Sequence, residues 1–213
     1  MEKLAIFDVD FTLTKRETLM EFYIFMMKKD LKLIRHLPKS LGATLLYISK
    51  IYDAQKAKEY FIAFIEGIEE IKMKELVKEF YEKKLSKIFY QDGIDMMKKL
   101  KGEGFKVYLI SASAEFYLNE LYNIKEVDKV IGTRFKCQDG RHRRNMEGLN
   151  CKGEEKVKRL METLKEENIE VDFKSSYMFS DSLSDSPLLN LVGNPYLINY
   201  KKGHKTIKNL NWR

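Results

Sequence analysis

The 213-residue chain contains few of the residues that build loop-rich or cross-linked folds: three prolines, eleven glycines and two cysteines. So little proline and glycine argues against a fold dominated by turns. The spacing of Cys137 and Cys151 alone would allow a disulfide, but two cysteines without a secretory segment favour reduced thiols. We assign neither cysteine a role.

Long apolar runs are also absent. No stretch approaches the roughly 20 apolar residues that span a bilayer, and the first apolar run ends at Asp8, too early for a signal peptide. These absences predict a cytoplasmic protein, with peripheral contact at the inner face of the membrane as an alternative. His36 and His204 have no partners at metal-ligand spacing.

The composition is that of a globular protein, with 44% hydrophobic and 33% charged residues. A net charge of +7 favours anionic partners, a class that includes phosphorylated metabolites, nucleic acid and acidic membrane surfaces. Charge alone does not choose among them, so the choice has to come from residues at particular positions.

Short apolar runs alternate with helical patterns over most of the chain. We predict strands at 4–7, 105–110, 129–132, 176–180 and 196–199, and helices at 92–100, 114–122, 152–168 and 187–192. Asp139-Gly140 predicts a hairpin within 133–149. Strands that alternate with helices form parallel sheets with right-handed crossovers. We therefore expect an α/β fold with a three-layer, Rossmann-like parallel sheet.

The segment 17–86 has a different pattern. Apolar residues and lysines recur there at helical spacing, and Pro38 and Gly67 interrupt them. About four helices and no strand are predicted. We therefore expect a core of residues 1–16 and 87–213, with residues 17–86 inserted after the first strand as an α-helical cap.

Polar side chains follow three of the predicted strands. In open parallel sheets, ligands bind beyond the carboxyl ends of the strands, so these side chains should meet at one edge. A lysine in the first turn of the helix before the fourth strand should join them. The set comprises Asp8 and Asp10 after the first strand, Ser111 to Ser113 after the second, Asp181 and Asp185 after the fourth, and Lys156.

These residue types suit the transfer of a phosphoryl group. A carboxylate can attack phosphorus to form an acyl phosphate, and a second carboxylate can protonate the leaving oxygen and then activate water. So many acidic groups would repel a phosphate unless a cation such as Mg²⁺ bound to their oxygens. Ser111 and Lys156 would hold the phosphoryl oxygens.

Each feature alone has a simpler interpretation. An acidic pair at a strand end is common, a Ser-Ala-Ser segment often caps a helix, and a lysine is usually solvated. Asp181 and Asp185 could be a capping and surface pair. Their joint order at strand ends and helix starts favours the site.

At these residues the chain resembles the haloacid dehalogenase superfamily, in motif order and over nearly its whole length. Asp8 to Thr14 is similar to the first motif, Ser111 to the second, and Ser180 to Leu189 to the fourth. The lysine of the third motif is either Lys152 or Lys156. Gly153 to Val157 resembles the Gly-x-x-Lys-Val form, which favours Lys156.

The resemblance implies a Mg²⁺-dependent phosphatase with an aspartyl-phosphate intermediate. Asp8 would be the nucleophile and a metal ligand, and Asp10 the acid and base with its carbonyl on the metal. Asp181 would bind the metal and Asp185 would support it, while Ser111 and Lys156 take part in catalysis. Substrate contacts are expected from Thr12, Glu17, Ala112 and Ser113.

Within the superfamily, the helical insertion is similar to the cap of the phosphoserine-phosphatase-like subfamily IB. Glu17 stands where serine phosphatases bind the substrate amine. Arg16 and Arg35 are the only arginines before the second motif, and neither falls in the later cap helices, which argues against phosphoserine. The chain is more similar to uncharacterised subfamily IB hydrolases and to phosphatidylglycerophosphatase C-type enzymes. Phe11 replaces a glycine of many relatives and would narrow the substrate range.

The cap segment Met20–Ile51 is basic and rich in aromatic residues. Its cations are Lys28, Lys29, Lys32, Arg35 and Lys39, and its aromatic residues include Phe22, Tyr23, Phe25 and Tyr47. Such a segment is typical either of an anionic membrane contact or of a solvated face over an ordinary helical lobe. We therefore expect the substrate to be a phosphorylated small molecule or a lipid phosphate, with the lipid-like alcohol preferred.

Three alternatives differ in class. A phosphoserine-phosphatase-like metabolite phosphatase and a phosphotransferase that uses an alcohol acceptor would share every residue named. A non-enzymatic module that binds RNA or membrane would have lost at least one of these residues, so we expect no nucleic-acid partner. No obligate protein partner is evident.

Overall fold

The computed structural model describes the backbone of residues 1–213 and all side chains except those of Leu37, Lys39, Ser40, Leu41, Thr44 and Tyr47. Lys39 and Tyr47 belong to the predicted basic, aromatic segment, so their part of that prediction lies outside the described residues.

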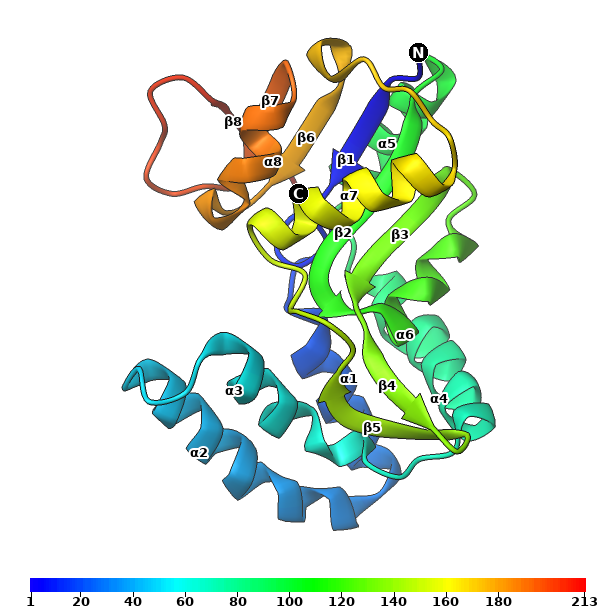
Figure 1. Ribbon diagram of the computed structural model, residues 1–213, viewed down its shortest axis with the longest axis vertical. Helices are drawn as coiled ribbons and strands as arrows, with labels where there is room; N and C mark the ends of the chain where they lie inside the picture. Colours follow the sequence, from blue (N-terminus) through cyan, green and yellow to red (C-terminus); the bar gives the residue numbers. More distant parts are fainter.

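Six parallel strands form one sheet in the order β3-β2-β1-β6-β7-β8 (Figure 1). The order places β1 at the centre, beside β2 and β6, so the ends of these three strands are neighbours. The prediction of a parallel α/β sheet is confirmed. The strands are β1 (Leu4–Phe7), β2 (Lys106–Ala114), β3 (Val127–Thr133), β6 (Tyr177–Ser180), β7 (Asn194–Ile198) and β8 (Lys208–Leu210).

Both faces of the sheet are covered by helices. The central strand is apolar at every position, so its side chains need a cover on each face. Leu4 and Ile6 point to one face and Ala5 and Phe7 to the other, as strand geometry requires. Helices α7 (Glu154–Glu166) and α8 (Ser186–Leu191) cover the first face, and α5 (Gln91–Gly102) covers the second (Figure 1). Short helices α6 (Glu115–Leu118), η4 (Asn119–Asn123), η5 (Phe173–Ser175) and η6 (Leu183–Asp185) complete the connections.

Only helices are assigned between β1 and α5. The segment contains α1 (Thr18–Lys29), η1 (Leu31–His36), α2 (Leu37–Ile48), α3 (Ala54–Phe61), η2 (Ile62–Ile65), α4 (Glu70–Lys83) and η3 (Leu85–Lys87). Its aromatic residues join the core, since the ring of Phe22 lies 5.1 Å from that of Phe80 and 5.3 Å from that of Tyr117. The insert therefore shares one hydrophobic cluster with the sheet. The division into a core and a cap at residues 17 and 86 stays a prediction.

The predicted hairpin is present as β4 (Phe135–Gln138) and β5 (Arg141–Met146). It is hydrogen-bonded to the helical insert, with the Ile68 carbonyl accepting from the His142 amide at 2.8 Å. Its basic tip is paired there too: Arg141 contacts Glu69, and Arg143 contacts Glu66. The tip thus connects the hairpin to the insert.

Two strand predictions were incomplete. β2 continues through Ser111 to Ala114, with an irregular register after Ile110, so the serines belong to the strand and do not follow it. β8 was not predicted at all. It is a three-residue, largely exposed edge strand after a Lys- and Gly-containing loop, and it carries no apolar alternation.

The two cysteines are free, Cys137 exposed and Cys151 buried, which agrees with the expectation of reduced thiols. Within the described residues, no helix is both long and apolar enough to cross a bilayer.

The backbone of Gly193, just before β7, lies close to the backbone of Lys174, and a substitution that adds one methyl group tests this contact. A Cβ atom on Gly193 would overlap the Lys174 carbonyl oxygen. We expect Gly193→Ala to lower the free energy of unfolding by about 3 kcal/mol, at the upper end of the usual cost of overpacking. In the control, Gly102→Ala, the new Cβ meets no atom within 4 Å, and we expect no loss. Urea unfolding measures both, and equal effects would contradict the contact.

Candidate active site

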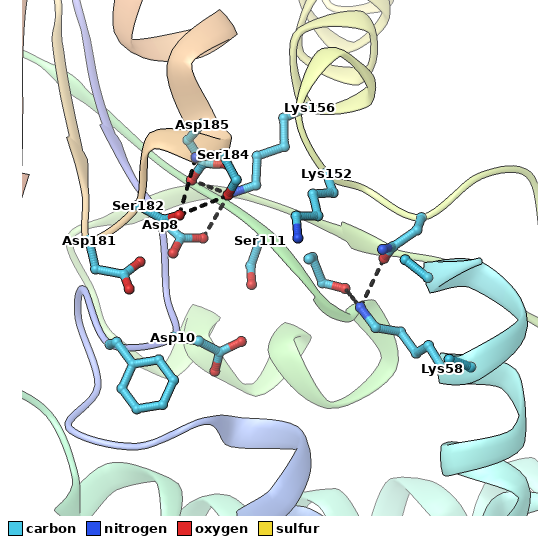
Figure 2. A pocket seen from close by; sticks show the side chains of 15 residues that line it. Asp8, Asp10, Lys58, Ser111, Lys152, Lys156, Asp181, Ser182, Ser184 and Asp185 are labelled. Atoms are coloured by element: carbon cyan, nitrogen blue, oxygen red, sulfur yellow. Dashed lines mark hydrogen bonds and ion pairs between the residues drawn. The ribbon is translucent and has the colours of Figure 1, made fainter. Parts of the chain in front are cut away.

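A cavity of about 310 Å³ opens between the carboxyl edge of the sheet and helix α3. The strands β1, β2 and β6 deliver Asp8, Ser111 and Asp181 to it, as expected for neighbouring parallel strands. Figure 2 shows these side chains around a common space, with Asp10 below and Lys156 above. The convergence predicted from the sequence is therefore present.

Lys156 joins two acidic segments of the site. Its ammonium donates to Asp8 Oδ1 at 2.8 Å and to Asp185 Oδ2 at 2.7 Å, and the three side chains are almost completely buried. Ser180 also donates to Asp185 Oδ2 at 2.9 Å. Asp185 is thus the partner of Lys156 and Ser180, and its support of a metal stays a prediction.

The choice between the two candidate lysines follows from the same contacts. Lys152 lines the cavity but forms no ion pair with any described side chain, whereas Lys156 contacts Asp8 directly. The first turn of α7 aims Lys156 at the end of β1 (Figure 2).

Burial controls the ionisation of this group of residues. Burial raises the pKa of Asp8, against the opposing charge of Lys156, to about 7. Burial and the neighbouring Asp185 raise the pKa of Asp181 to about 6. Although burial lowers the pKa of Lys156, Asp8 and Asp185 outweigh this and raise it above its ordinary value. Lys156 therefore stays charged. A further cation beside Asp8 and Asp181 would lower the pKa of both carboxyls and so favour their ionised forms.

Asp10 is oriented by groups that do not face the cavity. Its Oδ1 accepts from the Thr18 amide at 2.7 Å, and its Oδ2 accepts from Ser113 Oγ at 2.5 Å. Thr18 Oγ1 in turn donates to Ser113 Oγ at 3.1 Å. The start of helix α1 therefore fixes the Asp10 carboxylate beside the cavity.

Three residues expected to touch substrate have other roles in the structure. Thr12 Oγ1 accepts from the Asp181 amide at 2.8 Å and joins the loops after β1 and β6. Ser113 positions Asp10. Glu17 caps helix α1 by accepting from the Met20 amide at 2.8 Å, and burial raises its pKa to about 7. None of the three lines the cavity, whereas Ala112 does.

The cavity lining has the oxygen ligands that Mg²⁺ prefers. Four carboxylates and three ammonium groups line it, so a surplus of negative charge remains: Asp8, Asp10, Asp181 and Asp185 against Lys58, Lys152 and Lys156. Among the described residues, no three acidic, histidine or cysteine side chains form a complete metal cluster. Mg²⁺ commonly binds through one or two carboxylates, waters and the substrate phosphate. Asp8, buried, and Asp181, half-buried, both line the cavity and fit that mode.

The sequence interpretation missed Lys58 of helix α3. Its ammonium donates to the Ala112 carbonyl and to Asn150 Oδ1, each at 2.9 Å. Burial lowers its pKa to about 8, and the Lys152 charge acts in the same direction against Asp10 and Glu17. The available signal was a lysine on the same helical face as Ala54, Ala57 and Phe61, a face that lacks any other charge.

Phe11 occupies a backbone conformation that favours glycine, with φ at 57°. For an L-residue with a side chain this costs on the order of 1–2 kcal/mol. The ring lines the cavity and is 47% exposed. A bulky group therefore stands at the entrance where the resemblance leads one to expect glycine.

The sequence pattern of haloacid dehalogenase-like hydrolases matches residues 5–190. The chain belongs to this family. This hydrolase is 32% identical over 98 residues to histidinol-phosphatase of Neisseria meningitidis serogroup C (strain 8013), a match that covers 45% of this chain and only 44% of that protein. The predicted superfamily is thereby confirmed.

Solved structures show the same fold. A protein of unknown function from Bordetella pertussis Tohama I superposes on the hydrolase with a TM-score of 0.84 and 22% identity, over 95% of this chain and 92% of that one. A substrate-bound phosphoserine phosphatase superposes with a TM-score of 0.65 and 17% identity, over 95% and 88%. At these identities the likeness establishes the fold of the hydrolase, and its chemistry has to be argued from its residues.

The buried ion pairs of Lys156 predict a pH-dependent stability loss. In Lys156→Met, Asp8 and Asp185 would lie buried without their cation, which should lower the free energy of unfolding by about 3 kcal/mol at pH 7.5. Burial already raises the pKa of Asp8 and Lys156 opposes that rise, so without Lys156 the carboxyl would bind a proton more readily as the pH falls, and the loss should shrink at pH 5. Lys158→Met on the exposed face of α7 should change little. Urea unfolding at both pH values decides, and a loss independent of pH would contradict the ion-pair account.

Proposed function

We propose that this hydrolase cleaves phosphate monoesters, with Asp8 as the nucleophile and Mg²⁺ as the cofactor. The observation that carries the proposal is the position of Asp8 at the end of β1, where Lys156 holds one carboxylate oxygen. The other oxygen accepts only a long 3.4 Å bond from Thr12. It faces a cavity that Ser111, Asp10 and Asp181 also line.

In the proposed first step, the free oxygen of Asp8 bonds to phosphorus as the bond from phosphorus to the alcohol oxygen breaks. Asp10 gives its proton to the departing alcohol oxygen. In the second step, Asp10 takes a proton from water, the water oxygen bonds to phosphorus, and the bond to Asp8 breaks to release phosphate. Thr18 and Ser113 keep the Asp10 carboxylate in one orientation for both proton transfers.

The phosphoryl oxygens would be bound by Lys156 and Ser111. Both side chains are buried and held in place, Lys156 by two carboxylates and Ser111 by the Ser113 amide at 3.0 Å. Preorganised donors of this kind stabilise the charge that develops during transfer. Mg²⁺, bound by Asp8, Asp181 and the Asp10 carbonyl, would balance the negative charge of the substrate and favour ionised Asp8.

The far side of the cavity favours an alcohol that carries its own negative charge. Lys58 and Lys152 line that side, and the two ammonium groups repel one another in the absence of an anion. Glu17, the expected amine ligand, is not among the residues that line the cavity, and one of its oxygens caps α1. We therefore prefer an anionic alcohol, including a lipid-linked one, to phosphoserine. A phosphotransferase would use the same residues, and transfer of the phosphate to added glycerol would identify it.

The first test is phosphate release from a panel of phosphomonoesters that includes p-nitrophenyl phosphate, phosphoserine, sugar phosphates and phosphatidylglycerol phosphate. We expect turnover with Mg²⁺, none with EDTA, and a loss of roughly a thousandfold or more in Asp8→Asn, which removes the nucleophile. Asp139→Asn, at the exposed hairpin tip, is the matched control and should retain full activity. Full activity of Asp8→Asn would refute the mechanism.

A second test concerns Lys58 and the charge of the alcohol. In Lys58→Met, we expect the KM for an anionic-alcohol substrate to rise roughly ten- to a hundredfold. This factor corresponds to the free energy lost with one hydrogen bond to a charged group. The KM for p-nitrophenyl phosphate should not change. Because the pKa of Lys58 is about 8, the wild-type KM for the anionic substrate should rise above pH 8, and that of the variant should not.

The matched control is Lys56→Met, on the exposed side of the same helix. It should preserve both KM values and the pH profile of the wild type. An equal rise in KM for both substrates in Lys58→Met would instead indicate that the lysine only holds α3 against the core.

A further inference from the structure

The largest concentration of exposed apolar side chains along the sequence lies on the insert. Twelve large hydrophobic residues are exposed among those described, and five of them fall between residues 31 and 51. We call these five the apolar edge: Leu31, Ile34, Leu45, Ile48 and Ile51. Monomeric proteins rarely expose such groups together unless the surface contacts a partner.

Three of these side chains form a continuous series at the end of α2. Leu45 and Ile48 are one helical turn apart, so they share a face, and Ile51 follows in the turn to α3. They are between 65% and 69% exposed. Helix α2 packs against α3 on its other side, so the apolar edge covers no other part of the protein.

Along the sequence, the segment that carries the apolar edge has charge of one sign. No aspartate or glutamate occurs between Asp30 and Asp53, whereas this interval contains Lys32, Arg35, Lys39 and Lys50. Of these, Lys32, Arg35 and Lys50 form no salt bridge with any described side chain. On α4, by contrast, Lys72, Lys74 and Lys83 are each paired with a glutamate. Lys32, Arg35 and Lys50 are therefore not held in ion pairs by any described side chain, unlike the lysines of α4.

We propose that the apolar edge docks on the surface of an anionic lipid bilayer. Aliphatic side chains that enter the interface and flanking cations that meet acidic head groups are the two contributions that bind such surfaces. A second copy of the chain is a poorer occupant, because a two-fold contact would place these unpaired cations opposite one another.

Docking would also bring the candidate active site to the membrane. Helix α3 begins at Ala54, three residues after Ile51, and Ala54 and Ala57 line the cavity. Figure 1 shows the turn between α2 and α3 at the outer end of the insert. A bilayer that holds Ile48 and Ile51 would thus lie beside the cavity, within reach of a phosphate on a lipid head group. This consequence for the substrate rests on the proposed function.

The test is flotation of the full chain with vesicles of phosphatidylcholine containing a quarter phosphatidylglycerol, and with vesicles of phosphatidylcholine alone. We expect binding to the anionic vesicles and at least tenfold weaker binding to the neutral ones. The double variant with Ile48→Glu and Ile51→Glu should bind the anionic vesicles at least tenfold less. Ile71→Glu on α4, where the isoleucine is 76% exposed, is the matched control and should bind like the wild type.

Hydrolysis of p-nitrophenyl phosphate is measured in parallel and should be equal in all three proteins, which shows that they are folded. The proposal is overturned if the wild type does not bind anionic vesicles, or if Ile71→Glu weakens binding as much as the double variant. It is also overturned if light scattering shows a dimer that the double variant dissociates, without vesicle binding. If p-nitrophenyl phosphate is not hydrolysed, the proposed function fails while flotation still decides the docking.

Discussion

Lys156 keeps its charge in a nearly buried position, and its carboxylate partners make this favourable. A buried ammonium is costly unless it is paired and hydrogen-bonded. Asp8 from the end of β1 and Asp185 from the segment before α8 provide the two partners. The interaction therefore joins three segments that are distant in the sequence. It also leaves Asp8 with one oxygen held and the other directed to the cavity.

Hydrogen bonds extend this order to the neighbouring loops. Thr12 links the loop after β1 to Asp181, and Ser113 links the end of β2 to Asp10 and to the start of α1. These serine and threonine side chains are buried, so their bonds are made in a medium that strengthens them. Side chains that a motif would assign to the substrate thus serve to position the carboxylates.

The helical insert is attached to the core in two different ways. Phe22 and Phe80 place α1 and α4 in the hydrophobic cluster of the sheet, and the β4–β5 hairpin is hydrogen-bonded to the same lobe. Helix α3, which lines the cavity, contacts the rest of the chain mainly through polar groups: Lys58 donates to Ala112 and Asn150, and Glu59 accepts from the Met146 amide. Polar contacts at the edge of a cavity are easier to break than a shared aromatic core. The weaker attachment therefore lies at α3, beside the cavity, and the firmer one at α1 and α4.

The amino-acid sequence determined the class of the fold and the position of the acidic residues, because both depend on local order. The sequence alone shows the apolar strand β1, the alternation of strands and helices after Asp92, and the acidic residues at strand ends. Parallel topology then brings those strand ends together. The sequence could not show that Asp185 pairs with Lys156, nor that Glu17 caps a helix. It also could not reveal that Lys58 reaches across from α3. Those roles depend on which atoms meet when distant segments are folded together, and only the tertiary structure decided them.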